Sequence, residues 1–465
     1  MLSLIAETGR RAERLIEGGV ISHLNNLTTP TGAYIEQRAD MQPVFNQDLF
    51  NQVFLDANLK RAWKQVRSNK GAAGADGLKV DNFLDWAKLH WKHCKAQIFR
   101  GNYRPSPVKR VEIDKPDGGK RLLGIPSVLD RVIQQAITQI LSPIFDPTFS
   151  ANSFCFRPKR SAQQAVKQVQ GFIKQKRQIA VDVDLSKFFD RVNHDLLMSK
   201  LSIRIRDKRL MALIGHYLRT GIMDKGRLLA SSEGVPQGGP LSPLLSNILL
   251  DSLDKELEHR GHYFARYADD FIILVKSLRA GKRVLSSISR FLETRLKLVV
   301  NTKKSQVVEV SQSKFLGFTF NHGRIQWHPK SLLSFKQEVL RLTNRNWGVS
   351  MKYQLFKLSQ FLRGWIGYFG IANAYQSCVD LDHWIRRRVR MCYWRQWRKP
   401  RTKVTNLLKR GVAIKSAVAC GITSKGPWRS SKTPGIQQAL SNSYLKTEGL
   451  ISLRDGWIKV HYPKR

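Results

Sequence analysis

Two aspartates, Asp269 and Asp270, stand next to each other directly before the apolar run 271–275. Adjacent carboxylates repel, and a segment about to enter a hydrophobic core needs a reason to carry them. A turn capped by an aspartate side chain is the structural explanation. Binding of a divalent cation is the functional one, because hard cations prefer carboxylate oxygens.

A second acidic site lies in the apolar segment 179–185. Asp184 is near its end and Asp182 lies two residues earlier, so a strand would place both on one face. Periodicity therefore does not choose between them. Carboxylates from two strands that meet could bind a metal together.

The elements that must position these residues follow from hydrophobic periodicity and turn residues. Residues 107–125 alternate as a β-hairpin with its turn at 116–119, and residues 263–275 read as strand, turn and strand around the aspartate pair. Helices are expected at 1–20, 51–70, 128–141 and from about 331 onward, and strands at 179–185 and within 295–320. The carboxylates thus lie in an α/β centre that is followed by helices.

The charge balance indicates a polyanionic partner. The 465 residues include 79 Lys and Arg against 35 Asp and Glu, a net charge of +44. Such an excess is costly through self-repulsion unless a polyanion neutralises it, and nucleic acid is the obvious one. A basic structural protein that binds nucleic acid without chemistry would also satisfy this balance. A membrane surface fits less well, because the basic residues are spread along the whole chain.

The cysteines and the hydropathy of the sequence indicate the cellular compartment of the protein. Five cysteines without a C-x-x-C pair indicate reduced thiols, with neither a disulfide framework nor a zinc site. No apolar run approaches the roughly 20 residues needed to span a bilayer. We therefore expect a soluble cytoplasmic protein.

The acidic motifs resemble those of a known family. Residues 184–190 read Asp-Leu-Ser-Lys-Phe-Phe-Asp and residues 267–270 read Tyr-Ala-Asp-Asp, which look like motifs A and C of reverse transcriptases. Between them, residues 234–243 (Gly-Val-Pro-Gln-Gly-Gly-Pro-Leu-Ser-Pro) are similar to motif B of the group II intron branch. Further segments resemble, in the family's order, its fingers blocks and motifs D and E: 69–77, 119–126 with 130–135, 156–162, 301–305 and 315–318. The resemblance covers roughly residues 50–450.

This resemblance implies a right-hand polymerase of the α+β class, with an antiparallel palm sheet and an α-helical thumb, or maturase X domain. The expected parts are an N-terminal extension at 1–50, fingers with the start of the palm at 51–178, the palm at 179–330, the thumb at 331–420 and a short basic nucleic-acid-binding segment at 421–465.

The resemblance also implies the catalytic residues. Asp184, Asp269 and Asp270 would bind two Mg²⁺ ions, which Mn²⁺ could replace, and the backbone carbonyl of Leu185 would complete a metal shell. Asp182 would remain a strand residue outside that shell. Ions about 4 Å apart would activate a primer 3′-hydroxyl and stabilise the leaving oxygen.

The dNTP site implied by the family lies on the hairpin and in motifs A, B and D. The candidate dNTP-binding residues are Lys120, Arg121, Phe189, Gln237 and Lys304. The basic residues would bind the triphosphate, Phe189 would exclude a 2′-hydroxyl, and Gln237 would contact the template or nucleotide.

Alternatives stay open within this set. Lys109 and Arg110 on the partner strand could bind the triphosphate instead, and one of Phe188 and Phe189 is expected to be core. The chain departs from the family at Ser305, where Thr is usual, and at 186–187, where Ser-Lys replaces the more frequent Lys-Gly.

The C-terminal helices carry a basic and aromatic stretch. Residues 384–410 include eleven Lys or Arg and no Asp or Glu, interleaved with Trp and Tyr, a composition that suits phosphate contact and base stacking. Residues 361–369 and 426–429 resemble the family's thumb. The candidate RNA-binding residues are Arg157, Arg386, Arg387, Arg388, Arg390, Trp394, Arg395, Trp397 and Arg398.

The implied function is copying RNA into DNA while binding intron RNA to assist its splicing and retrotransposition. The implied partners are group II intron RNA, an RNA template with a DNA primer, target DNA and dNTPs, in a bacterial cytoplasm at the nucleoid. We expect no cysteine-paired endonuclease domain, as in the compact bacterial class C type. The alternatives are a splicing-only maturase and a domesticated reverse transcriptase in phage defence or CRISPR adaptation; the clustered aspartates argue against a decayed palm.

Overall fold

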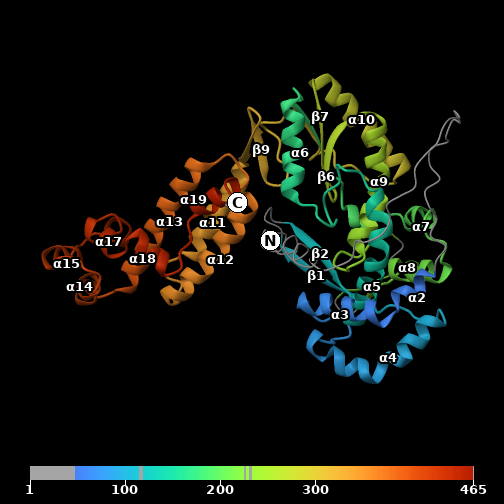
Figure 1. Cartoon of the computed structure of the whole chain (residues 1–465), viewed down its shortest axis with the longest axis horizontal. Helices are drawn as coiled ribbons and strands as arrows, with labels where there is room; N and C mark the ends of the chain where they lie inside the picture. The colour runs from blue at the N-terminus through green and yellow to red at the C-terminus, as the bar shows by residue number, and fades with distance from the viewer. Residues whose placement is uncertain (1–47, 115–118, 225–226, 230–232, 464–465) are drawn as a thin grey trace, which may run out of the picture. The chain divides into compact units, whose positions relative to one another are not determined.

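The computed structural model describes residues 48–114, 119–224, 227–229 and 233–463. The chain divides into two compact units between Val308 and Glu309 (Figure 1). The helix expected at 1–20 lies outside the described residues. A boundary at residue 330 was expected from the sequence, whereas the hairpin of β9 (Phe318–Asn321) and β10 (Arg324–Trp327) belongs to the second unit.

A helical layer and a small sheet form the first part of the first unit. The helices are α2 (Leu49–Val53), α3 (Asp56–Ser68), α4 (Phe83–Phe99) and α5 (Val128–Phe145). The hairpin expected at 107–125 is formed by β1 (Val108–Asp114) and β2 (Lys120–Ile125), with Asp114 opposite Lys120. Strands β4 (Ile222–Asp224) and β5 (Arg227–Leu229) extend it in the order β2-β1-β4-β5.

A buried carboxylate joins these elements. Asp130 in α5 is 1% exposed, and it accepts hydrogen bonds from the Tyr103 hydroxyl (2.7 Å), the Tyr217 hydroxyl (3.2 Å), the Ser127 hydroxyl (2.7 Å) and the Ser106 backbone N–H (3.1 Å). Burial raises the pKa of Asp130, and these four donors oppose that shift. The carboxyl group therefore ties α5 to the start of the hairpin and to α8 (Lys208–Leu218).

The central sheet has the order β6-β7-β3-β8. Its strands are β3 (Ile179–Val183), β6 (Tyr263–Tyr267), β7 (Asp270–Val275) and β8 (Gln306–Glu309), and β7 pairs antiparallel with both β3 and β6. Helices α6 (Ala162–Lys174) and α10 (Leu278–Arg295) pack against it, and α9 (Ser242–His259) contacts β6 (Figure 1). The strands expected within 295–320 are confined to β8 and β9, because residues 297–305 form a loop with one isolated bridge, between Leu185 and Val300.

The second unit is helical apart from the β9–β10 hairpin. Its helices are α11 (Pro329–Leu342), α12 (Met351–Phe369), α13 (Tyr375–Gln396), α14 (Pro400–Leu408), α15 (Ile414–Gly421), α16 (Pro427–Ser430), α17 (Pro434–Ala439), α18 (Asn442–Thr447) and α19 (Leu453–His461). Residues 421–465, expected as a separate basic segment, contribute α16 and α19, which pack against α13. No helix in the described residues is both long and apolar enough to cross a membrane.

One buried aspartate holds α19 in place. Asp382 in α13 is 4% exposed and accepts hydrogen bonds from the backbone N–H of Leu453 (2.9 Å) and Arg454 (3.1 Å) and from the Ser452 hydroxyl (2.6 Å). These backbone donors lie in the first turn of α19, where no intrahelical acceptor exists.

We predict that Asp382→Ala lowers the free energy of unfolding by about 3 kcal/mol, because it leaves buried donors without an acceptor. Chemical denaturation followed by circular dichroism measures this. The matched control is Asp380→Ala, which removes an exposed aspartate of the same helix and should change stability by less than about 0.5 kcal/mol. Equal effects of the two substitutions would contradict the assigned role of Asp382.

Candidate active site

The register of two strands brings the candidate carboxylates together. In the β3–β7 pair, Val183 lies opposite Phe271. Asp184 follows Val183 directly after the end of β3, and Asp270, the first residue of β7, precedes Phe271. Facing residues of an antiparallel pair have Cβ atoms roughly 5 Å apart. Asp269 precedes Asp270 in the turn between β6 and β7, and all three aspartates are half-buried.

Asp182 and Asp184 project from the same face of β3. A Cβ at Gly281 of α10 would lie 3.5 Å from the side chains of Ile179 and Val181, so these odd-numbered positions of β3 face α10. Because side chains alternate along a strand, Asp182 and Asp184 face the other side. Asp182, half-buried opposite Ile272, shares that face but is farther from the turn.

The segment 301–305 fixes the position of Asp184. The Asn301 side-chain amide donates to the Asp184 carboxylate (2.9 Å), and the Asn301 backbone N–H donates to the Asp184 carbonyl (2.8 Å). The Asp184 backbone N–H donates in turn to the Ser305 hydroxyl (3.0 Å). Ser305, a departure from the family's usual Thr, thus keeps a hydroxyl at this point.

The turn between β6 and β7 is strained. Tyr267 pairs with Asp270, and Ala268 has φ = 61°, in the left-handed region where a Cβ costs roughly 1–2 kcal/mol. A non-glycine residue held in this region marks a position that its surroundings determine, and such positions cluster at functional sites. This strain falls on the residue directly before Asp269.

The donor set fits a divalent cation of the Mg²⁺ type. Within the described residues, no cluster of three His, Cys, Asp or Glu side chains is arranged to bind a metal alone. Mg²⁺ prefers hard oxygens and is usually held by one or two carboxylates, with waters and substrate phosphates completing its shell. Asp184 and Asp270, at the meeting ends of two strands, match that requirement.

The loop 234–243 packs closely on the β1–β2 hairpin. The Gly124 backbone N–H of β2 donates to the Gln237 carbonyl (2.7 Å). Gly238 has φ = 128°, and a Cβ there would lie 2.3 Å from the Gly124 carbonyl oxygen. The close approach requires glycine and places Gln237, which is half-buried, beside the hairpin.

The same loop supports the phenylalanines. The Val235 backbone N–H donates to the Phe189 carbonyl (2.6 Å), and the Phe188 and Phe189 rings meet edge to face at 5.1 Å. Phe188 is 2% exposed and belongs to the core, whereas Phe189 is half-buried. Of the two residues, Phe189 is therefore the one that remains accessible.

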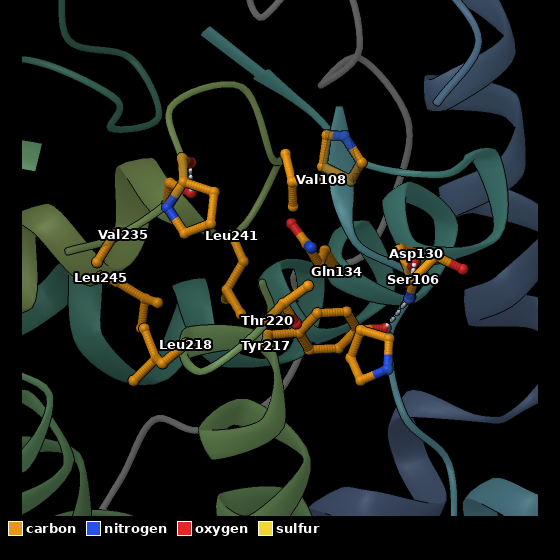
Figure 2. A pocket seen from close by; sticks show the side chains of 14 residues that line it. Ser106, Val108, Asp130, Gln134, Tyr217, Leu218, Thr220, Val235, Leu241 and Leu245 are labelled. Carbon is orange, nitrogen blue, oxygen red and sulfur yellow. Dashed lines mark hydrogen bonds between the residues drawn. The ribbon is translucent and has the colours of Figure 1, made fainter. Parts of the chain in front are cut away.

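A small cavity lies beneath this loop (Figure 2). Its volume is about 20 Å³, and Val108, Gln134, Tyr217 and Val235 are among the residues that line it. A space of this size holds about one water molecule. It is a packing gap between the hairpin, α5 and α8, too small for a nucleotide.

The basic candidates for triphosphate binding have different surroundings. Lys120 is exposed and forms an ion pair with Glu112, and Arg110 forms one with Asp224 (3.1 Å). Lys109 and Lys304 are exposed. The strand position of Arg121 is described, but its side chain lies outside the described part of the structure.

Arg157, a candidate for RNA contact, instead forms hydrogen bonds within the protein interior. Its side chain is 6% exposed and donates to the Asp146 carboxylate (2.7 Å) and to the carbonyls of Asp146 (2.9 Å), Ser150 (2.6 Å) and Ser153 (3.0 Å). Four of its five donors are thereby used within the protein. We therefore correct its assignment from RNA contact to loop support.

Three candidates in α13 and just after it are also interior. Trp394 is 1% exposed and Trp397 8% exposed, so their faces are covered and not available for base stacking. Arg390 is 9% exposed and donates to the Leu440 carbonyl (2.9 Å) and the Asn442 side chain (3.0 Å). A helix packed on several sides buries part of its basic residues, which periodicity did not reveal.

The remaining candidates lie nearer the surface. Arg387 stacks on Trp428 at 3.6 Å, and Arg388 hydrogen-bonds Thr343. Arg386 is half-buried, and Arg395 and Arg398 are exposed. Arg395 and Arg398 are therefore the candidates most available to a polyanion.

One buried charge beside the turn was not predicted from the sequence. Arg266 in β6 forms an ion pair with Asp254 of α9 at 2.6 Å, and neither side chain is exposed. The available signal was an arginine between Ala265 and Tyr267 within a strand expected to be buried, because a buried charge requires a partner.

Comparison with known families agrees with this geometry. Residues 113–320 match the family described as reverse transcriptase (RNA-dependent DNA polymerase), and residues 332–411 match the group II intron maturase-specific domain. The chain is 31% identical over 341 residues to protein YkfC of Escherichia coli K12, covering 64% of this chain and 89% of that protein. It is 28% identical over 323 residues to the group II intron-encoded protein LtrA of Lactococcus lactis, covering 55% of this chain and 54% of LtrA.

Among solved structures, a partial Cas6-RT-Cas1–Cas2 complex matches with 24% identity and a TM-score of 0.36, covering 55% of this chain and 44% of that one. A truncated apo telomerase from Candida tropicalis matches with 15% identity and a TM-score of 0.37, covering 51% and 60%.

The chain therefore contains an RNA-directed DNA polymerase domain of the reverse transcriptase class. It belongs to the group II intron reverse transcriptase/maturase family. Membership implies use of a divalent metal and, through the maturase-specific domain, binding of intron RNA. The chain spans about half the length of LtrA.

We predict that Asn301→Ala lowers kcat for nucleotide incorporation roughly tenfold, because a hydrogen bond to a charged group contributes about 1.5–3 kcal/mol and here orients Asp184. Single-turnover primer extension measures this. Thr302→Ala, an exposed neighbour in the same loop, is the matched control and should stay within about twofold. A folded Asn301→Ala protein with wild-type kcat would refute the orienting role.

Proposed function

We propose that this chain is an RNA-directed DNA polymerase whose catalytic residues are Asp184, Asp269 and Asp270. The supporting observation is the β3–β7 register, which brings the ends of two strands with these carboxylates together within the reverse transcriptase domain. The proposed architecture is a right hand, with fingers on the β1–β2 hairpin, a palm on the central sheet and a thumb in the helical unit.

The carboxylates would act as ligands of two Mg²⁺ ions, together with the Leu185 carbonyl. When bound, such ions polarise the α-phosphate, activate the primer 3′-hydroxyl and neutralise the leaving pyrophosphate. The chain's own contribution is orientation: Asn301 holds the Asp184 carboxylate by a 2.9 Å hydrogen bond. Mn²⁺ would substitute for Mg²⁺ at a site made of oxygen ligands.

The incoming dNTP would bind on the surface formed by the hairpin and the loop 234–243. Lys120 and Arg121 would contact the triphosphate, and Lys304 would protonate the leaving group. Lys120 would exchange its exposed partner Glu112 for phosphate, a small cost because surface ion pairs contribute little. Gln237 would contact the template or nucleotide, and the accessible ring of Phe189 would exclude a 2′-hydroxyl.

We further propose that the protein binds its own group II intron RNA, assists its splicing and copies it into target DNA during retrotransposition. The maturase-specific match at 332–411 supports this. Arg395 and Arg398, with Arg386, Arg387 and Arg388, would contribute to the RNA surface. Assignment to the bacterial class C type and to a nucleoid-associated cytoplasmic particle remains a prediction from the sequence motifs.

Primer extension on a defined RNA template tests the polymerase proposal. We expect the wild-type protein to extend a DNA primer with dNTPs and Mg²⁺, and Asp269→Ala to abolish extension while RNA affinity is unchanged. Asp195→Ala, which removes an exposed aspartate of α7 (His194–Ser202), is the matched control and should extend normally.

Absence of extension by a folded, RNA-binding wild-type protein would refute the polymerase proposal and support a splicing-only maturase. Extension that Asp269→Ala leaves intact would refute the assignment of the carboxylates.

The RNA surface is tested by salt dependence. We expect Arg395→Gln/Arg398→Gln to weaken intron RNA binding and to reduce the slope of log affinity against log salt by about 1–2, since each lost phosphate contact removes about 0.7–0.9. Filter binding over a salt series measures this. Lys282→Gln/Arg283→Gln on α10 is the charge-matched control, with two exposed side chains outside the maturase-specific domain. Equal slopes for the two double variants would refute the proposal that Arg395 and Arg398 contact the RNA.

A further inference from the structure

A fully buried arginine lies directly before the aspartate turn. The Arg266 and Asp254 side chains are 0% exposed and form a bidentate ion pair, with Nε–Oδ1 and Nη2–Oδ2 distances of 2.7 and 2.6 Å. Desolvation cancels much of the attraction in a buried pair, so such a pair is weak evidence for stability. Stability alone therefore does not explain this pair, and the other contacts of Arg266 become important.

The remaining donors of Arg266 complete the explanation. Its Nη1 donates to the Asn247 side-chain oxygen (3.0 Å) and to the Ala268 carbonyl (3.0 Å), and its Nη2 donates to the Ser153 hydroxyl (2.8 Å). A guanidinium has five N–H donors in a rigid plane, and all five have acceptors here. Four acceptor residues are thus fixed relative to one another.

These acceptors come from three separate segments. Asp254 and Asn247 lie on α9, whose first two residues, Ser242 and Pro243, are the last two of the segment 234–243. Ser153 lies in the segment 150–157, which the Asn247 amide also reaches through the Cys155 carbonyl (2.9 Å). Backbone hydrogen bonds join that segment to Arg266 in both directions, at 2.9 and 3.0 Å. The third segment is the turn itself, through Ala268.

The bond to Ala268 matters because of the conformation of that residue. Ala268 has φ = 61°, which its Cβ disfavours, so the turn requires outside support. The Ala268 carbonyl belongs to the same rigid peptide plane as the Asp269 N–H. Fixing that carbonyl therefore fixes the direction in which the chain enters Asp269 and Asp270.

We propose that Arg266 is a positioning residue for polymerisation: through its hydrogen bond to the Ala268 carbonyl, it holds the 267–270 turn in the strained conformation that directs the Asp269 and Asp270 carboxylates. This inference rests on the proposed function, in which those carboxylates are catalytic. Arg266 does not touch substrate, and its effect is on the geometry of residues that do.

If Arg266 were purely structural, removing it would change stability but not kcat in the folded protein. The decisive variant must therefore remove the hydrogen bond to the Ala268 carbonyl without leaving a buried charge. Arg266→Met/Asp254→Leu replaces both ions with apolar side chains, a change that buried ion pairs often tolerate. We expect this variant to remain folded and to keep its affinity for template–primer, with a lowered thermal unfolding midpoint because the acceptors on Asn247, Ser153 and Ala268 lose their donors. Its kcat should fall roughly tenfold or more, with the KM for dNTP changed less than about threefold, because positioning acts on the chemical step.

Two further variants provide a second test and a control. Arg266→Lys keeps the charge opposite Asp254 but has three donors and no planar fork, so its kcat should also fall, and it decides the question if the double variant does not fold. Arg260→Met is the matched control. Its ion pair with Glu256 lies at the C-terminal end of α9, where the two side chains are 32% and 28% exposed, and kcat should be unchanged.

A readout independent of turnover uses Fe²⁺ in place of Mg²⁺. With ascorbate and peroxide, Fe²⁺ bound at the site should cleave the wild-type backbone near Asp184 and Asp269, and cleavage should weaken in Arg266→Met/Asp254→Leu. Wild-type kcat and cleavage in the folded double variant, or in Arg266→Lys, would overturn the inference while leaving the proposed function intact. Normal extension by Asp269→Ala would instead overturn the proposed function.

Discussion

The antiparallel pairing of β3 with β7 is the constraint on which the site depends. A strand register sets every side chain on one face or the other, so a slip of one residue would move the carboxylates to the opposite face. The pairing of Val183 with Phe271 is secured by burial, since these side chains are 1% and 0% exposed. The hydrophobic core of the sheet therefore determines where the charged end of the sheet lies, and the segment 301–305 then orients Asp184 from the side.

Buried polar groups mark the joints between chain segments. Asp130 joins the hairpin region to α5 and α8, Asp382 joins α13 to α19, and Arg266 joins the turn to α9. Removing one partner of a buried ion pair costs about 3–5 kcal/mol, although replacing both with apolar residues can be neutral. Each of these groups therefore fixes how the segments around it pack.

Local patterns predicted the elements that carry the chemistry. Alternation predicted the hairpin at 107–125. The hairpin at 263–275 was predicted from the apolar segments on either side of Asp269 and Asp270, and both of its strands are buried. The aspartates stood out because adjacent charges precede a buried strand. The contacts of Arg266 could not be predicted, since its acceptors come from distant parts of the chain and from a backbone carbonyl.

The arginines of α13 show what composition alone could not predict. Eleven basic residues without an acid between 384 and 410 suggested one continuous surface for RNA. In the structure, Arg390 and Trp394 are buried, and Arg387 stacks on Trp428. Long basic and aromatic side chains can cover a helix core as readily as they bind a ligand. Composition identified the segment, but only tertiary packing separates its interior residues from its exposed ones.

The close contact between Gly124 and Gly238 has a mechanical consequence. With a hydrogen bond of 2.7 Å from Gly124 to Gln237 and no side chain between the two backbones, the hairpin and the loop 234–243 form one stiff joint. In the proposed function, a displacement of the hairpin on triphosphate binding would be transmitted to Gln237 and, through the Val235–Phe189 hydrogen bond, to the Phe189 ring. Binding of the phosphates by the hairpin and contact of Gln237 and Phe189 with the nucleotide would then be parts of one movement.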